Sequence, residues 1–163
     1  MYNGGMERKV KRVYVDTTVV LGNFDEGESR RQHTKEFWDA VRNGTIVAIT
    51  SDVLRGELRE DNIERASQFL ATLPKNQLEQ VAISEEARML SEQYIADGVV
   101  GKGSRNDCRH VALATILADG IVSWNMGDMV KRADKYNSVN VAQGYPEIKI
   151  VTPDKYKEID NES

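Results

Sequence analysis

Residues 106–125 read NDCRHVALATILADGIVSWN and contain both kinds of segment from which the chain is built. The apolar run from Val111 to Leu117 predicts a helix over residues 106–119, which ends at Gly120 because glycine is a frequent helix stop. The run from Ile121 to Trp124 predicts a short buried strand. A helix that leads directly into a buried strand is typical of proteins in which the two kinds of element alternate.

The same alternation continues on both sides of this stretch. Further strands are predicted at residues 12–16 and 46–49, around residue 81, and at residues 148–151. Helices are predicted at residues 31–42, after residues 51 and 52, and at residues 63–73, 85–97 and 129–136, with loops at residues 22–29 and 98–103. This order predicts an α/β fold of three layers, in which a mostly parallel central sheet is flanked by helices.

The composition indicates one domain that does not enter a membrane. A chain of 163 residues can bury a full core, and its single cysteine excludes an intramolecular disulfide. No apolar run approaches the ~20 residues that span a bilayer, so we expect a cytoplasmic protein. We expect residues 1–11 to be a flexible N-terminal extension, residues 12–153 to form the domain and residues 154–163 to be an acidic C-terminal tail. The net charge of −4 argues only weakly against a nucleic-acid partner, because basic residues cluster at residues 8–12, 102–105 and 131–135.

Four oxygen-bearing side chains lie at the edges of apolar segments, namely Asp16, Glu57, Asp107 and Asn125. In an open parallel sheet, the residues that follow the carboxyl ends of the strands meet in one crevice. Carboxylate and amide oxygens in such a crevice favour Mg²⁺ or Mn²⁺, which prefer oxygen ligands. The sequence therefore points to phosphodiester hydrolysis assisted by a metal ion.

Each of these side chains also has a purely structural explanation. Asp16 and Asp107 lie where an aspartate can cap or stabilise a helix start, and Glu57 can be a solvated residue of an amphipathic helix. His110, one turn after Asp107, is either a proton carrier or a histidine that packs against its apolar neighbours. Three acids at equivalent positions on separate elements favour a common site over three independent caps.

Several of these segments together resemble the PIN-domain family, and in particular its bacterial toxin-antitoxin branch. The resemblance extends from residue 12 to about residue 153 and is carried by Val15-Asp16-Thr17-Thr18-Val19-Val20, Gly22, Phe24-Asp25-Glu26, the acidic helix from Leu54 to Leu58, residues 106–115, and Val122-Ser123-Trp124-Asn125 with Val130. Its most specific part is the run around Asp107 together with Ser-Trp-Asn.

The resemblance implies a metal-dependent endoribonuclease that acts on RNA, is often a homodimer, and is often held inactive by a small antitoxin protein whose segment fills the active groove. The three acids usually seen as catalytic ligands for Mg²⁺ or Mn²⁺ match, by position, Asp16, Glu57 and Asp107. Asn125 stands at the family's fourth acid position, and Asp128, three residues later, is a candidate to restore the missing charge. Thr17 is expected to hold Asp16 in position.

Two other functions stay open on the sequence alone. One is a non-catalytic PIN-like module that binds RNA or a protein, with Asn125 marking an incomplete metal site. The other is a metal-dependent small-molecule phosphatase, which lacks the nucleophilic Asp-x-Asp pattern because Asp16 is followed by two threonines. Metal binding separates the nuclease from the non-catalytic module, since only the nuclease requires it.

Overall fold

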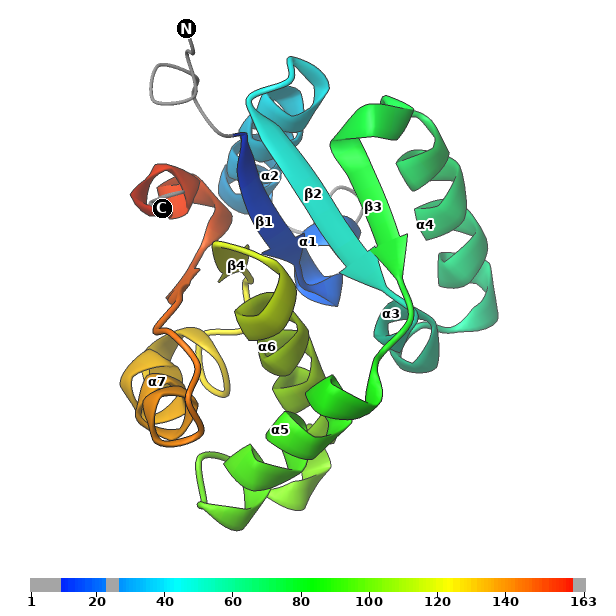
Figure 1. Cartoon of the computed structure of the whole chain (residues 1–163). Helices are drawn as coiled ribbons and strands as arrows, with labels where there is room; N and C mark the ends of the chain where they lie inside the picture. The colour runs from blue at the N-terminus through cyan, green and yellow to red at the C-terminus, as the bar shows by residue number, and fades with distance from the viewer. Residues whose placement is uncertain (1–9, 23–26, 160–163) are drawn as a thin grey trace, which may run out of the picture.

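A computed structural model gives the fold shown in Figure 1 and describes residues 10–22 and 27–159. The strands are β1 (Lys11–Val15), β2 (Ile46–Ser51), β3 (Leu78–Val81), β4 (Gly120–Val122) and β5 (Lys149–Val151). The α-helices are α1 (Thr17–Leu21), α2 (Glu28–Arg42), α3 (Val53–Glu57), α4 (Glu60–Ala71), α5 (Glu85–Ala96), α6 (Arg105–Leu117) and α7 (Ala133–Ala142). Short 3-10 turns are η2 (Lys75–Gln77), η3 (Lys102–Ser104), η4 (Val130–Arg132) and η5 (Pro153–Glu158). In the described part of the chain, no helix is long and apolar enough to cross a membrane.

The strands of the described sheet are all parallel and lie in the order β3-β2-β1-β4-β5. The chain starts in the centre of the sheet, moves outward to β2 and β3, and returns past β1 to β4 and β5. At such a reversal the connections after β1 and β4 lead away on opposite sides, which opens a crevice beyond the carboxyl ends of these strands. Val15 pairs with Val122, so residues 16 and 123 leave the sheet side by side.

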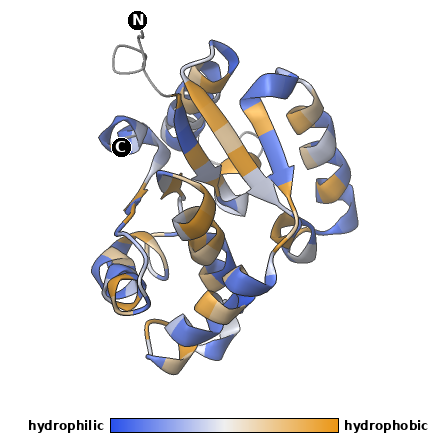
Figure 2. Ribbon diagram, viewed as in Figure 1, coloured by the Kyte–Doolittle hydropathy of each residue, from blue (hydrophilic) through white to orange (hydrophobic). Residues whose placement is uncertain are grey.

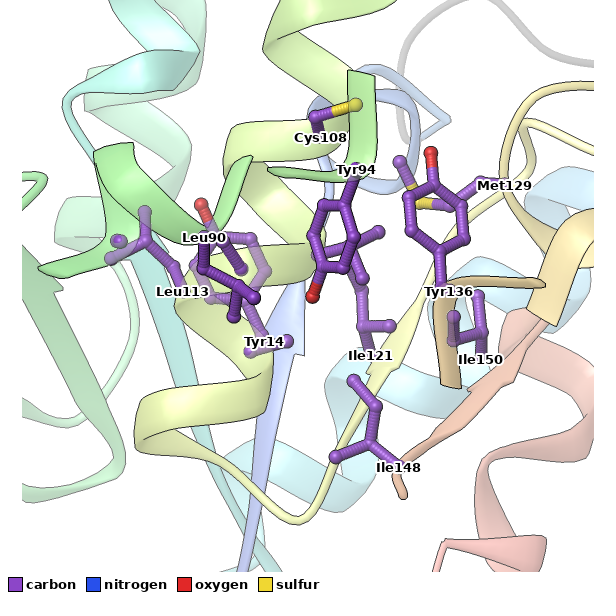
Figure 3. Packing of buried hydrophobic residues seen from close by; sticks show 14 of the residues in the cluster. Tyr14, Leu90, Tyr94, Cys108, Leu113, Ile121, Met129, Tyr136, Ile148 and Ile150 are labelled. Carbon is purple, nitrogen blue, oxygen red and sulfur yellow. The ribbon is translucent and has the colours of Figure 1, made fainter. Parts of the chain in front are cut away.

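Helices cover both faces of the sheet and make three layers (Figure 1). Tyr14 of β1 faces a core that it shares with α5, α6 and α7, whereas Val13 and Val15 face a second core with α2 and α4. Figure 3 shows the first of these cores. Figure 2 shows hydrophobic residues along the inner strand β2, while the edge strand β3 is hydrophilic over much of its length. The predicted three-layer α/β fold is confirmed.

Two boundaries of α5 follow directly from local sequence. The Ser84 side chain accepts a hydrogen bond from the backbone N–H of Ala87 at 3.1 Å, as expected of an N-cap serine. After the helix, Gly98 has a φ of +76°, a left-handed conformation that glycine adopts without strain. The segment that follows, predicted as a loop, includes the turn η3 and leads into α6.

Several boundaries differ from those predicted. The helix predicted at residues 106–119 ends at Leu117, and Gly120, predicted as its stop, is the first residue of β4. β4 ends at Val122 rather than at Trp124, because the backbone N–H of Trp124 donates to the Thr18 hydroxyl at 2.8 Å instead of continuing the ladder. The helix predicted at residues 31–42 begins at Glu28, inside the predicted loop, of which residues 23–26 lie outside the described residues. The helix predicted at residues 129–136 is a 3-10 turn followed by α7, which continues to Ala142.

The ends of the domain also differ from the expected division. Lys11 already belongs to β1, where it pairs with Ile46, while residues 1–9 lie outside the described residues. The segment expected to be a tail begins with η5, where Tyr156 packs on Phe37 with 5.8 Å between ring centroids. Ile159 is fully buried in the core with α2, so residues 154–159 are part of the domain; residues 160–163 lie outside the described residues.

Gly120 is required where β4 begins, because the structure leaves no room there for a side chain. A Cβ at this position would lie 2.9 Å from both Ile159 Cγ1 and the carbonyl oxygen of Lys149. We expect Gly120→Ala to lower the free energy of unfolding by about 1–3 kcal/mol, the usual cost of overpacking a core, as measured by urea denaturation. Gly127→Ala is the matched control, because a Cβ there meets nothing within 4 Å. Equal stability losses in the two variants would contradict this explanation.

Candidate active site

Asp16 lies in the crevice beyond β1 and β4, where it follows β1 directly and is 1% exposed. Its Oδ2 accepts hydrogen bonds from the hydroxyls of Thr18 at 2.8 Å and Ser123 at 2.6 Å. Although Asp16 occupies the N-cap position of α1, its side chain makes no capping hydrogen bond, so the capping explanation is wrong. The carboxylate is instead held from β4, and its Oδ1 lies 3.5 Å from Nε2 of His110.

Glu57 reaches the same crevice from the end of α3. This helix starts directly after β2, where the Ser51 hydroxyl accepts a hydrogen bond from the backbone N–H of Val53 at 3.2 Å. Oε1 of Glu57 accepts a hydrogen bond from the Thr17 hydroxyl at 2.6 Å and lies 2.5 Å from Nε2 of His110. The side chain of Glu57 is only 22% exposed. Glu57 is therefore not a freely solvated helix residue, and its Oε2 has no hydrogen-bond partner among the described residues.

His110 of α6 joins the two carboxylates. The imidazole is 1% exposed, and its Nδ1 forms a 2.7 Å hydrogen bond with the hydroxyl of Tyr14. That hydroxyl lies 2.7 Å from the hydroxyl of Ser51. One ligand atom from each of Asp16, Glu57 and His110 lies within 4.8 Å of the other two. His110 is therefore in direct contact with the site as well as packed in the core.

The pKa values of Glu57 and His110 shift in opposite directions. Burial acts to raise the pKa of Glu57, but the hydrogen bonds from His110 and Thr17 and the charge of the imidazole outweigh it, and the pKa is lowered. Burial acts to lower the pKa of His110, but the hydrogen bond to Glu57 and the charges of Asp16, Glu57 and Asp107 outweigh it, and the pKa is raised. Each group thus stabilises the charged form of the other.

Asp107, one turn before His110 on α6, lies beside this cluster without joining it. Its carboxylate is not in the group whose ligand atoms lie within 4.8 Å of one another, and among the described residues it has no hydrogen-bond or ion-pair partner. Burial and then the charges of Asp16 and Glu57 raise the pKa of Asp107 to about 6. The structure therefore brings Asp16 and Glu57 into one cluster with His110. It leaves Asp107 outside this cluster but close enough for their charges to repel its carboxylate.

Hydroxyl groups hold the carboxylates, although not in the way predicted. Thr17, expected to hold Asp16, instead donates to Glu57 at 2.6 Å and lies 3.2 Å from Nε2 of His110. The hydroxyls that hold Asp16 come from Thr18 and Ser123. The role of Ser123 was not predicted, although a polar residue inside the apolar run from Ile121 to Trp124 was a usable signal.

Asn125 and Asp128 stabilise the turn after β4. The side-chain oxygen of Asn125 accepts a hydrogen bond from the backbone N–H of Asp128 at 3.1 Å, which closes the turn. Asp128 accepts a hydrogen bond from the Ser104 hydroxyl at 2.9 Å, and its Oδ1 lies 3.7 Å from Nε of Arg132. Its charge contributes to the raised pKa of Asp107, so it lies near the site but already has partners of its own.

Comparisons with known proteins bear on the fold. No family model matches the chain, and no curated protein sequence matches it. Among solved structures, the chain is similar to VapC20 of Mycobacterium tuberculosis, described as a sarcin-ricin loop cleaving toxin, with a TM-score of 0.53 and 14% sequence identity over 83% of this chain and 98% of that chain. VapC20 is a PIN-domain toxin. The chain therefore has a PIN-domain fold, which confirms at the level of the fold what the sequence resemblance implied.

We expect Asp107→Asn to stabilise the protein at pH 8 in the presence of a chelator, because the variant lacks a carboxylate whose charged form the folded state disfavours. The pKa of Asp107 is raised to about 6, above its unfolded value, so wild-type stability falls as the pH rises through this window and stays lower above it. With allowance for solvent screening at this half-buried group, the expected gain is about 1 kcal/mol in urea denaturation. The gain should shrink as the pH falls from about 6 to about 4. A variant less stable than wild type at pH 8 would refute the repulsion.

Proposed function

We propose that this protein is a metal-dependent endoribonuclease that hydrolyses RNA phosphodiester bonds with Mg²⁺ or Mn²⁺. One observation carries the proposal: Asp107 is a half-buried carboxylate with a raised pKa and no partner among the described residues, beside two further carboxylates. A divalent cation bound to the carboxylate oxygens relieves such repulsion, and oxygen ligands of this kind suit Mg²⁺ and Mn²⁺. The donor groups of the crevice therefore fit the ion that the PIN fold implies.

In this proposal Asp16, Glu57 and Asp107 hold the ion through their oxygens. When bound, the ion lowers the pKa of a water molecule and stabilises negative charge on the phosphate. The chain's own residues fix the ligands. Thr18 and Ser123 engage Oδ2 of Asp16 and leave its Oδ1 3.5 Å from Nε2 of His110. Thr17 engages Oε1 of Glu57 and leaves its Oε2 without a hydrogen bond from the described residues.

The similarity to VapC20 supports a more specific role, the toxin of a type II toxin-antitoxin pair. In this role the partners are an RNA substrate, a small antitoxin protein and a second copy of the chain, all in the cytoplasm. A short reading frame beside the gene, encoding a protein that relieves growth arrest when co-expressed, would support the role. Its absence would remove the toxin assignment and leave the nuclease assignment intact.

We expect Asp16→Asn to reduce RNA cleavage by about 100-fold or more, because it removes charge from a direct metal ligand. The fold should persist, since asparagine keeps a side-chain oxygen that accepts from Thr18 and Ser123. Cleavage of single-stranded and structured RNA with Mg²⁺ or Mn²⁺ measures the loss, and circular dichroism checks the fold. Glu64→Gln, which neutralises an exposed carboxylate on α4, is the control and should cleave like wild type. Full activity of Asp16→Asn would remove the site assignment.

The rival function is a non-catalytic PIN-like module that binds RNA or a protein. The observation in its favour is Asn125, whose amide closes a turn and brings no charge to the crevice. The two functions differ in metal binding. Failure of the wild-type protein to bind Mn²⁺ at millimolar concentration in calorimetry would favour the rival.

A further inference from the structure

We propose that His110 is a metal ligand whose Nε2 binds the divalent cation together with Asp16 and Glu57, and that this nitrogen makes the site prefer Mn²⁺ to Mg²⁺. The inference rests on the proposed function and adds a donor that the three-acid assignment does not contain. In the cluster whose ligand atoms lie within 4.8 Å of one another, the third donor group beside Asp16 and Glu57 is the imidazole of His110 and not Asp107.

The distance from Nε2 to Asp16 fits a shared ion, and the distance to Glu57 requires a movement. Nε2 lies 3.5 Å from Oδ1 of Asp16 and 2.5 Å from Oε1 of Glu57. Around an octahedral ion with bonds of about 2.1 Å, adjacent ligand atoms are about 3 Å apart and opposite ones about 4.2 Å apart, so the spacing to Asp16 lies within this range. The contact with Oε1 of Glu57 is too short for two ligand atoms of one ion, so this hydrogen bond would have to break, and Oε2, which has no hydrogen bond from the described residues, is the oxygen available to the ion. Glu57 can make this movement, because it ends a five-residue helix and its side chain is partly exposed.

The other side of the imidazole holds the ring in the orientation that coordination requires. A metal-bound histidine carries its proton on the nitrogen that faces away from the ion and usually donates it to an oxygen. Here Nδ1 lies 2.7 Å from the Tyr14 hydroxyl, which in turn lies 2.7 Å from the Ser51 hydroxyl. Without the ion, Nε2 donates its proton to Glu57; binding of the ion would release this proton to solvent. Donation from Nδ1–H to Tyr14, and from the Tyr14 hydroxyl to Ser51, would then leave the lone pair of Nε2 directed at the ion. The two rings pack with 5.4 Å between centroids, which restrains rotation of the imidazole.

A nitrogen donor changes which ion the site prefers. Mg²⁺ is held mainly by oxygen and gives up its water reluctantly, whereas first-row transition ions accept imidazole readily. His110 is fully buried, so in the coordination shell it would take a place that Mg²⁺ usually keeps for water. The site should therefore bind Mn²⁺ more tightly than Mg²⁺.

Pulsed electron paramagnetic resonance of the full chain loaded with Mn²⁺ tests the ligand directly. We expect hyperfine coupling to a directly bound nitrogen in the wild-type protein and its loss in His110→Gln. Calorimetry should show that the preference for Mn²⁺ over Mg²⁺ also falls in this variant. His33→Gln is the matched control, because His33 is the chain's other histidine and lies partly exposed on α2. That variant should keep both the coupling and the preference.

Tyr14→Phe provides a second test if His110→Gln does not fold. This variant keeps the imidazole and removes only the hydroxyl that orients it, so Mn²⁺ affinity should fall by about 10- to 100-fold. Tyr94→Phe is its control: it removes another buried tyrosine hydroxyl from the same core (Figure 3), one that donates to Asn140 at 2.5 Å. We expect both variants to have a lower Tm and only Tyr14→Phe to bind Mn²⁺ more weakly.

The outcomes separate the ligand assignment from the proposed function. Binding of Mn²⁺ by the wild-type protein without nitrogen coupling would overturn the role of His110 and leave the nuclease proposal intact. Nitrogen coupling that persists in His110→Gln would also overturn the role of His110 as a ligand. Equal Mn²⁺ affinities in Tyr14→Phe and Tyr94→Phe would overturn it too. Absence of any Mn²⁺ binding would overturn both proposals together.

Discussion

The burial of neighbouring carboxylates at one edge of the sheet is the constraint on which the site depends. The register between β1 and β4 places Asp16 beside Ser123, the short helix after β2 delivers Glu57, and α6 delivers Asp107. Part of the charge is balanced within the chain, because three hydroxyls and a buried imidazole engage the first two acids. The third acid has no such partner among the described residues, and burial, followed by the charges of Asp16 and Glu57, raises its pKa to about 6. The negative charge at Asp107, which no described residue balances, makes this position suitable for a bound cation.

The order of the strands and helices could be predicted from the sequence, because the same two patterns of apolar residues recur along the chain. Buried parallel strands are short apolar runs and the helices between them have apolar periodicity, so their order predicts a doubly covered parallel sheet. The same logic located Asp16, since an acid at the end of a buried strand stands out from its neighbours. Glu57 was located by its place after the second strand.

The contacts inside the crevice were not accessible in this way, because they depend on how elements rotate against one another. Thr17 and Thr18 are adjacent, yet the start of a helix turns them toward different carboxylates. His110 obtains its orientation from Tyr14, a residue 96 positions earlier, through a core that no local pattern describes. In the C-terminal segment, acidic composition concealed Ile159, a fully buried member of the second core.

The packing of Ile159 over the start of β4 has a practical consequence. Val10 precedes β1, so both described ends of the chain lie at the amino edge of the sheet, opposite the carboxyl ends of β1 and β4 (Figure 1). A fluorophore, a surface tether or a fused carrier protein joined near either end would extend away from the carboxylates. The chain can therefore be immobilised or observed as single molecules without covering the edge of the sheet that carries Asp16.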